Sequence, residues 1–97
     1  MIHHIVLFRF KPGTTPAQIA AVGQALLGMR AGIPYLRSGI WGPNLAHGAG
    51  DFTHVWIAQL DDMDAVKRYS DDPVHMAVVR DVIVPIREAR LAVDVEA

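Results

Sequence analysis

Residues 51–75, DFTHVWIAQLDDMDAVKRYSDDPVH, decide the fold of this 97-residue chain. Residues 52–60 are rich in β-branched and aromatic side chains, which predicts a strand. Asp61 or Asp62 follows where a helix N-cap belongs, so a helix is expected next. Pro73 interrupts that helix, because proline disfavours helical geometry in the residue before it. The stretch therefore predicts a strand, a capped helix and a second helix that starts at the proline.

Four polar side chains of this stretch are candidates to line a pocket: Thr53, His54, Tyr69 and His75. Tyr69 and His75 are six residues apart, and on one unbroken helix they would point to different sides. The break at Pro73 allows them to converge. The sequence thus predicts a polar site where the two helical segments meet.

The rest of the chain alternates strand and helix signals. Residues 2–11 and 35–41 predict strands, and Gly39 within the second of them suggests a bulge or a sharp bend. A helix with Thr15 as its N-cap and Pro16 as its first residue lies between them. Residues 42–50 predict a loop, residues 74–83 resume helical periodicity, and Leu91, Val93 and Val95 alternate with polar neighbours in a final half-buried strand. The order is β-α-β-β-α-β, which predicts an α+β, ferredoxin-like single domain over residues 1–97, with both helices on one face of a four-stranded antiparallel sheet.

The hydrophobic content indicates a partner surface. Hydrophobic residues make up 52% of the chain, more than a lone domain of this size easily buries. We expect the uncovered sheet face to bind a second copy, so that two sheets enclose a dimeric α/β barrel. On this interpretation Trp56→Asp would yield monomer or aggregate. The apolar residues of one strand parity, which we expect on that open face, are Val6, Phe8, Phe10, Phe52, Trp56 and Leu60.

Composition also argues against several classes of partner. Nine Lys and Arg stand against ten Asp and Glu, with no run of either sign, so a nucleic-acid partner is not expected. No apolar stretch approaches the roughly 20 residues that span a bilayer, and the N-terminus does not resemble a signal peptide, so we expect no membrane partner and a cytoplasmic location. The absence of cysteine excludes disulfides, thiolate nucleophiles and cysteine zinc sites.

Three motifs carry a family resemblance. HIVLFRFK at residues 4–11, DFTHVWI at residues 51–57, and Tyr69 followed by DDPVH at residues 71–75 are similar to the stress-responsive dimeric α/β-barrel (Dabb) family. The resemblance covers nearly the whole chain. It implies a homodimer that encloses a barrel, and in each subunit a cavity between sheet and helices.

The best understood activity in that family is that of the plant olivetolic acid cyclase, which closes a linear polyketide by aldol condensation without metal or cofactor. The resemblance implies His75 as general base, Tyr69 as hydrogen-bond donor to the substrate, and His4 and His54 as substrate-binding residues of the pocket. The ligand would be a polyketide-like or other carbonyl-rich, hydrophobic or aromatic small molecule. One alternative is a non-catalytic stress-associated dimer, a scaffold or binding protein. Another is a cofactor-free monooxygenase, which rests on fold analogy alone.

Physical chemistry leaves plain roles open for the same residues. His75 near a helix start would have its protonation opposed by the helix dipole, and a neutral imidazole can accept a proton from an acidified carbon. Equally, His75 can bond to backbone, Tyr69 can fill the core, and His4 and His54 can be satisfied barrel-lining side chains.

A metal site is not expected. If the first and third strands pair along their full lengths, His4 and His54 lie four residues apart along the ladder, roughly 13 Å. No HxH or HExxH spacing supplies two ligands from one element. The carboxylate pairs Asp61-Asp62 and Asp71-Asp72 flank helix ends, where capping is a sufficient explanation.

Overall fold

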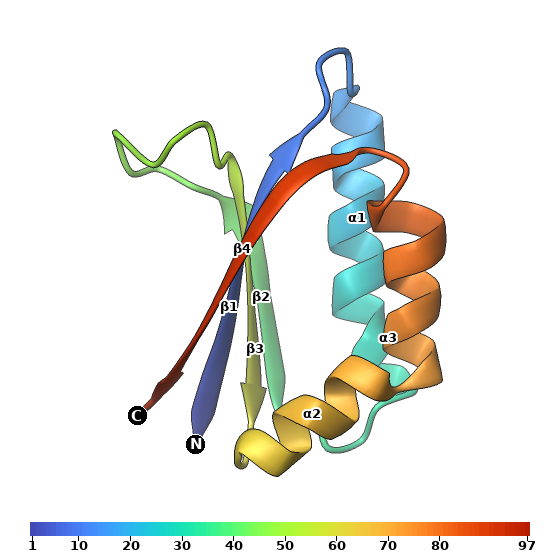
Figure 1. Ribbon diagram of the computed structural model, residues 1–97. Helices are drawn as coiled ribbons and strands as arrows, with labels where there is room; N and C mark the ends of the chain where they lie inside the picture. Colours follow the sequence, from blue (N-terminus) through green and yellow to red (C-terminus); the bar gives the residue numbers. More distant parts are fainter.

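The protein forms one four-stranded sheet covered on one face by helices (Figure 1). The computed structural model describes residues 1–97. It confirms the predicted β-α-β-β-α-β order and the ferredoxin-like fold, with the second helical segment divided in two. The elements are β1 (Ile2–Phe10), α1 (Pro16–Gly28), β2 (Ser38–Pro43), β3 (His54–Leu60), α2 (Met63–Asp71), α3 (Pro73–Val78) and β4 (Arg87–Glu96).

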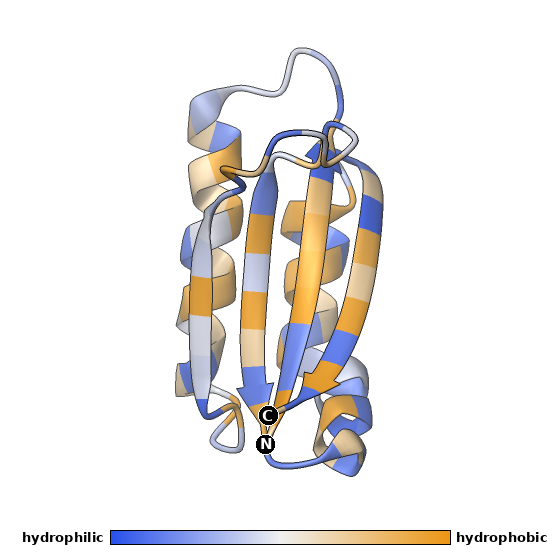
Figure 2. Ribbon diagram, turned by 90° about the vertical axis from the view of Figure 1, so that its left-hand side faces the viewer, coloured by the Kyte–Doolittle hydropathy of each residue, from blue (hydrophilic) through white to orange (hydrophobic).

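The sheet is antiparallel throughout, with strand order β2-β3-β1-β4. Turning the molecule by 90° brings the uncovered face of the sheet to the front, with the helices behind it (Figure 2). Pairing runs from Ile2 opposite Leu60 to Phe8 opposite His54 between β1 and β3. No helix combines the length and apolar character needed to cross a membrane.

Local signals explain where α1 begins. The Thr15 side chain accepts a hydrogen bond from the Gln18 backbone N–H, and the Gln18 side chain accepts one from the Thr15 backbone N–H. This reciprocal capping box satisfies two N–H groups that the first helical turn leaves free. Pro16 occupies the first helical position, as predicted. A short 3₁₀ turn, Met29–Ala31, extends the helix to its end.

The break between α2 (Met63–Asp71) and α3 (Pro73–Val78) lies at Asp72 and Pro73. Asp62 caps α2 by accepting from the Ala65 backbone N–H at 2.8 Å. The α2 helix ends at Asp71, and Asp72 then accepts from the Val74 backbone N–H at 2.9 Å, with Pro73 as the first residue of α3. The predicted interruption is therefore confirmed, and Asp72 is the N-cap of the helix that follows it.

The prediction of which residues lie on the uncovered face of the sheet was wrong. Val6, Phe8, Trp56 and Leu60 lie beneath the helices and are at most 5% exposed. Phe10 packs against the same core, and Phe52 lies before the start of β3. The opposite parity forms the uncovered face. The residues that lie on that face are His3, Ile5, Leu7, Arg9, Ser38, Ile40, Gly42, Val55, Ile57, Gln59, Ala89, Leu91, Val93 and Val95.

The second strand also differs from the prediction. It begins at Ser38 rather than at residue 35 and continues to Pro43. Pairing with β3 passes through Gly39 without a bulge, with Gly39 opposite Ala58. A Cβ at position 39 would collide with the indole of Trp56. The glycine is therefore required by the close approach of a buried ring and does not bend the strand.

Candidate functional site

A cavity of about 360 Å³ lies between the sheet and the helices. Seven of its twelve lining residues are hydrophobic, and polar groups converge on it from β1, α2, α3 and β4. Such a mixture is typical of small-molecule sites. The lining residues are His4, Val6, Phe8, Leu26, Trp56, Tyr69, Ser70, His75, Val79, Ile83, Arg87 and Arg90.

The helical break brings Tyr69 and His75 together. Their ring centroids are 4.3 Å apart, although the residues stand on two different helices. Asp72 fixes the angle between these helices, because one carboxylate oxygen caps α3 and the other accepts from the Tyr35 hydroxyl at 2.9 Å. The predicted convergence of Tyr69 and His75 is therefore present, and Asp72 and Tyr35 hold it in place.

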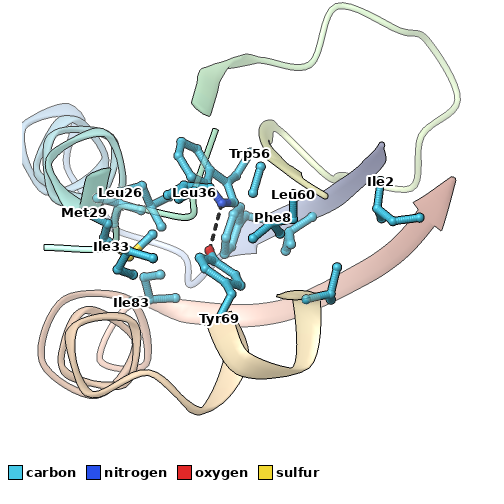
Figure 3. Close-up of a cluster of buried hydrophobic side chains, with 14 residues drawn as sticks. Ile2, Phe8, Leu26, Met29, Ile33, Leu36, Trp56, Leu60, Tyr69 and Ile83 are labelled. Carbon is cyan, nitrogen blue, oxygen red and sulfur yellow. Dashed lines mark hydrogen bonds between the residues drawn. The ribbon is translucent and has the colours of Figure 1, made fainter. Parts of the chain in front are cut away.

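Tyr69 presents a phenol to the cavity. Trp56 Nε1–H donates to Tyr69 Oη at 3.1 Å, as the dashed line in Figure 3 indicates. Because the hydroxyl oxygen accepts this bond, its own hydrogen is free to donate elsewhere. Burial raises the pKa of Tyr69 to about 12, so the group is a neutral donor at ordinary pH.

His75 presents a free nitrogen in a defined tautomer. Its Nδ1 lies 3.2 Å from the backbone carbonyl oxygen of Ser70. A carbonyl can only accept, so Nδ1 carries the hydrogen and Nε2 keeps its lone pair. Burial is the main cause that lowers the pKa of His75 below 6.5; the bond to Ser70 opposes this shift, while His4 and Arg90 add to it. The imidazole is therefore neutral near pH 7.

His4 completes the polar group from the sheet side. Its Nδ1 lies 2.6 Å from Asp94 Oδ1, and its ring meets Tyr69 edge-on with centroids 5.9 Å apart. The bond to Asp94 orients the ring across the strands β1 and β4. His4 thus lines the cavity, where the resemblance implied a pocket residue.

His54 and Thr53 lie outside this cavity. His4 is paired with Ala58, so His54 stands four positions further along β3, as the sequence indicated. His54 stacks on Trp41 with ring centroids 5.3 Å apart, and its Nδ1 lies 2.9 Å from Thr53 Oγ1. Desolvation by burial lowers its pKa. No group of three or more His, Asp or Glu side chains is placed to hold a metal ion.

Two features of the cavity went unnoticed in the sequence. Arg87 and Arg90 of β4 form part of its wall. A π-helical turn, Val79–Ile83, follows α3, and within it Val84 N–H donates to the Val79 carbonyl at 2.8 Å. Such wide turns often occur at functional sites, and here Val79 and Ile83 both reach the cavity. No motif marks either feature, and the two arginines reach the cavity through the pairing of β4 with β1, which is distant in the sequence.

Comparisons with known proteins agree with this architecture. The model of the family described as the stress-responsive A/B barrel domain matches residues 2–97. A dimeric ferredoxin-like protein of unknown function from Thermobifida fusca is 35% identical, with 99% of this chain and 90% of that chain covered and a TM-score of 0.83. None of the curated proteins matches.

Two further solved structures have the same fold. A Dabb family protein from Mesorhizobium loti is 24% identical, with 99% and 95% of the two chains covered and a TM-score of 0.85. A hydroxynitrile lyase from Passiflora edulis is 18% identical, with 97% of this chain and 90% of that chain covered and a TM-score of 0.86. At these identities the likeness is one of fold alone.

Proposed function

The chain belongs to the stress-responsive A/B barrel (Dabb) family, and from that premise we propose that it is an enzyme acting on a carbonyl-rich small molecule without a cofactor. The proposed reaction removes a proton from a carbon beside a carbonyl group, as in an aldol-type ring closure of a polyketide-like molecule. His75 acts as the base and Tyr69 as the hydrogen-bond donor. The observation that carries this proposal is the pair of rings 4.3 Å apart, one with a free acceptor and the other with a free donor, beside one cavity.

The proposed steps follow from the hydrogen bonds. His75 Nε2 takes the proton, and the electron pair of the broken C–H bond moves into the carbonyl to give an enolate. Tyr69 Oη–H donates to the enolate oxygen, where negative charge develops in a water-poor site. The carbon then attacks a second carbonyl of the same molecule, whose oxygen takes the proton back from the His75 imidazolium. Proton and charge balance, and no redox partner is needed.

The apolar wall and His4 would hold the molecule around this centre. Val6, Phe8 and Leu26 offer contact area for an aromatic or aliphatic body. His4 donates Nδ1–H to Asp94, which leaves Nε2 to accept a hydrogen bond from a substrate hydroxyl. His54 has no such position, since it packs against Trp41 outside the wall of the cavity.

We also propose that two copies associate through the uncovered sheet face. Ile40 is 60% exposed, and Leu91, Val93 and Val95 are each 49% exposed, side by side with half-buried Ile5, Leu7 and Ile57. An apolar surface of this kind is costly in water and is typical of an interface. The relative from Thermobifida fusca is itself described as dimeric.

The enzyme proposal is tested by proton exchange, which needs only the first chemical step. The full chain is incubated in D₂O with methyl phenylpyruvate, an uncharged aromatic carbonyl compound, and NMR follows exchange at the carbon between the ring and the carbonyl. We expect exchange above the buffer rate. His75→Gln should reduce the enzymatic rate by about 10²-fold or more, and Tyr69→Phe by a comparable factor.

His47→Gln is the matched control, because His47 lies in the exposed loop between β2 and β3. It should retain the wild-type rate. If wild type and His75→Gln both exchange at the buffer rate while the compound still raises the melting temperature, the alternative function is favoured: a small-molecule binding dimer with no chemistry.

A further inference from the structure

We infer that the cavity selects molecules that carry a carboxylate, and that Arg87 and Arg90 bind this group. The inference deepens the proposed function and rests on it for the identity of the reacting centre. It starts from the charges around the cavity. Two guanidinium groups belong to its wall, and no aspartate or glutamate does. The chain as a whole carries a net charge of −1, so this local excess of positive charge is not a property of the entire surface.

Neither arginine is used elsewhere. The ion pairs of the chain are formed by His4, Arg9, Arg37, Lys67 and Arg80. Arg87 and Arg90 therefore keep all their N–H donors available. A guanidinium matches a carboxylate with two parallel hydrogen bonds, and a cleft lined by charge of one sign concentrates ligands of the opposite sign.

A β-bulge at the start of β4 places Arg87 on the cavity side. Strands β1 and β4 pair regularly through Phe8 opposite Arg90 and Arg9 opposite Ala89. A regular ladder would then place Glu88 opposite Phe10, on the face covered by helices. Instead Phe10 is paired with Arg87, so the strand gains one residue and the alternation of faces is reversed. Bulges re-aim side chains in this way beside functional sites.

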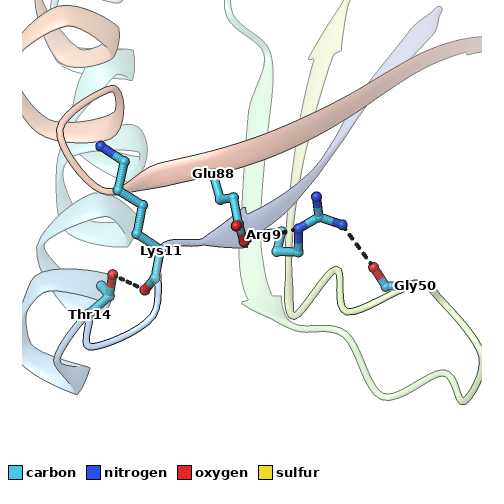
Figure 4. A network of polar contacts seen from close by, with 5 residues as sticks. All are labelled: Arg9, Lys11, Thr14, Gly50 and Glu88. Atoms are coloured by element: carbon cyan, nitrogen blue, oxygen red, sulfur yellow. Dashed lines mark hydrogen bonds and ion pairs between the residues drawn. The ribbon is translucent and has the colours of Figure 1, made fainter.

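The carboxylates near the cavity are engaged by other groups. Glu88 lies by Arg9, with Oε2 at 3.2 Å from Arg9 Nε, as the close-up of this end of the sheet shows (Figure 4). Asp94 is bonded to His4 at 2.6 Å. The bulge thus exchanges a carboxylate for a guanidinium at the cavity wall. Of the other nearby carboxylates, Asp94 is bonded to His4, and Asp72 accepts from Tyr35 and from the start of α3.

The position of the arginines relative to the reacting pair defines the class of molecule. Arg90 lies close enough to His75 to contribute to the lowering of its pKa. A bound molecule would place its carboxylate at the β4 edge, its carbonyl between Tyr69 and His75, and its apolar body against the core. This describes an aromatic or aliphatic oxo acid.

The first arm of the test compares two probes that differ only in charge. Exchange in D₂O is measured for phenylpyruvate and for its methyl ester, with wild type, Arg87→Met, Arg90→Met and the double variant. We expect wild type to favour the acid over the ester by tenfold or more in kcat/KM, after each is corrected for its buffer rate. The double variant should lose this preference, so that the ratio of its rates on acid and ester falls to about one.

Two further variants control for poor folding and for a general loss of positive charge. Arg90→Lys keeps the charge and should retain part of the preference even if Arg90→Met folds poorly. Lys67→Met removes an exposed positive charge of α2 and should retain all of it. Equal rates on acid and ester in wild type, or a preference that survives in the double variant, would overturn the inference and leave the proposed base and donor untouched.

The second arm measures binding alone, so that the two proposals fail separately. Benzoate and benzamide have nearly the same shape, and each is titrated while the melting temperature of wild type and the double variant is recorded. Benzoate should raise the wild-type melting temperature more than benzamide, and the double variant should abolish the difference. That result without any proton exchange would refute the proposed chemistry and keep the anion site; no difference in wild type would refute the anion site.

Discussion

The covered and uncovered faces of the sheet are built from similar residues but have different tasks. On the covered face, Trp56 and Phe8 are buried under the helices and form the floor of the cavity. On the uncovered face, Ile40 and Val93 are equally apolar, yet about half or more of each side chain is accessible. The difference shows that strand alternation separates two faces but does not identify which one the helices cover. Side-chain size is a better guide, because the large rings lie on the covered side.

The largest expected effect is a difference in the free energy of unfolding between a substitution on the covered face and one on the uncovered face. Trp56→Ala should lower the free energy of unfolding by about 3–5 kcal/mol, because it opens a large cavity in the core and removes the donor to Tyr69. Ile57→Ala, the next residue on the same strand, should cost clearly less, since its side chain is on the uncovered face. Urea unfolding compares them at a protein concentration low enough that the proposed dimer is dissociated. Similar losses for both variants would contradict the assignment of faces.

The next effect concerns dimerisation, which we expect to depend on the uncovered face alone. Val93→Glu places a charge among the exposed apolar residues of the edge strand β4, so the proposed dimer should dissociate to a folded monomer. Sedimentation equilibrium gives the mass, and far-UV circular dichroism checks the fold. Lys67→Glu, on exposed α2, is the control and should leave the mass unchanged. A dimer of undiminished affinity in Val93→Glu would exclude this face as the interface.

Two glycines of β2 offer a smaller and more local comparison. A Cβ at Gly39 would collide with Trp56 on the covered face, whereas a Cβ at Gly42, on the uncovered face, would meet no atom within 4 Å. Gly39→Ala should therefore destabilise by about 1–3 kcal/mol through overpacking. Gly42→Ala should be neutral or stabilising by about 0.5–1 kcal/mol, because alanine loses less backbone freedom on folding. Thermal unfolding measures both, and the prediction fails if the two variants shift the melting temperature in the same direction by similar amounts.

The order of elements was readable from the sequence because each boundary has a local chemical cause. Thr15 and Pro16 start α1, Asp62 starts α2, and Pro73 interrupts the helical run. The same local chemistry brought Tyr69 and His75 together, since their convergence depends on that single break. These predictions required no knowledge of distant contacts.

Other predictions failed where the answer depends on long-range pairing. Gly39 looked like a bend because its sequence neighbours do not reveal Trp56, which reaches it from the adjacent strand. Arg87 has the wrong parity for the cavity until the bulge opposite Phe10 is known. For Gly39 and Arg87 the missing information is the register between strands. The separation of His54 from His4 by four positions, in contrast, was already indicated by the sequence, and it was the family resemblance that grouped the two residues.

The smallest expected effect is the pH dependence of the free energy of unfolding, which arises from histidines under the helices. Burial lowers the pKa of His75 below its ordinary value of 6.5, with His4 and Arg90 lowering it further and Asp72 and the Ser70 carbonyl opposing. The unfolded chain therefore takes up more protons than the folded chain as pH falls through about 6.5, so the free energy of unfolding decreases with acidification until the pH is below the folded-state pKa. His54, whose pKa is also lowered, acts in the same direction.

Replacement of His75 tests this linkage directly. His75→Asn should flatten the dependence of the free energy of unfolding on pH between about 7 and 5, a window above the titration of most carboxylates. His47→Asn, in the exposed loop, should leave the slope as it is in the wild type. The slope is obtained from urea unfolding at several pH values. A steeper slope in His75→Asn would mean that the folded state favours protonated His75, which is incompatible with a neutral base facing the cavity.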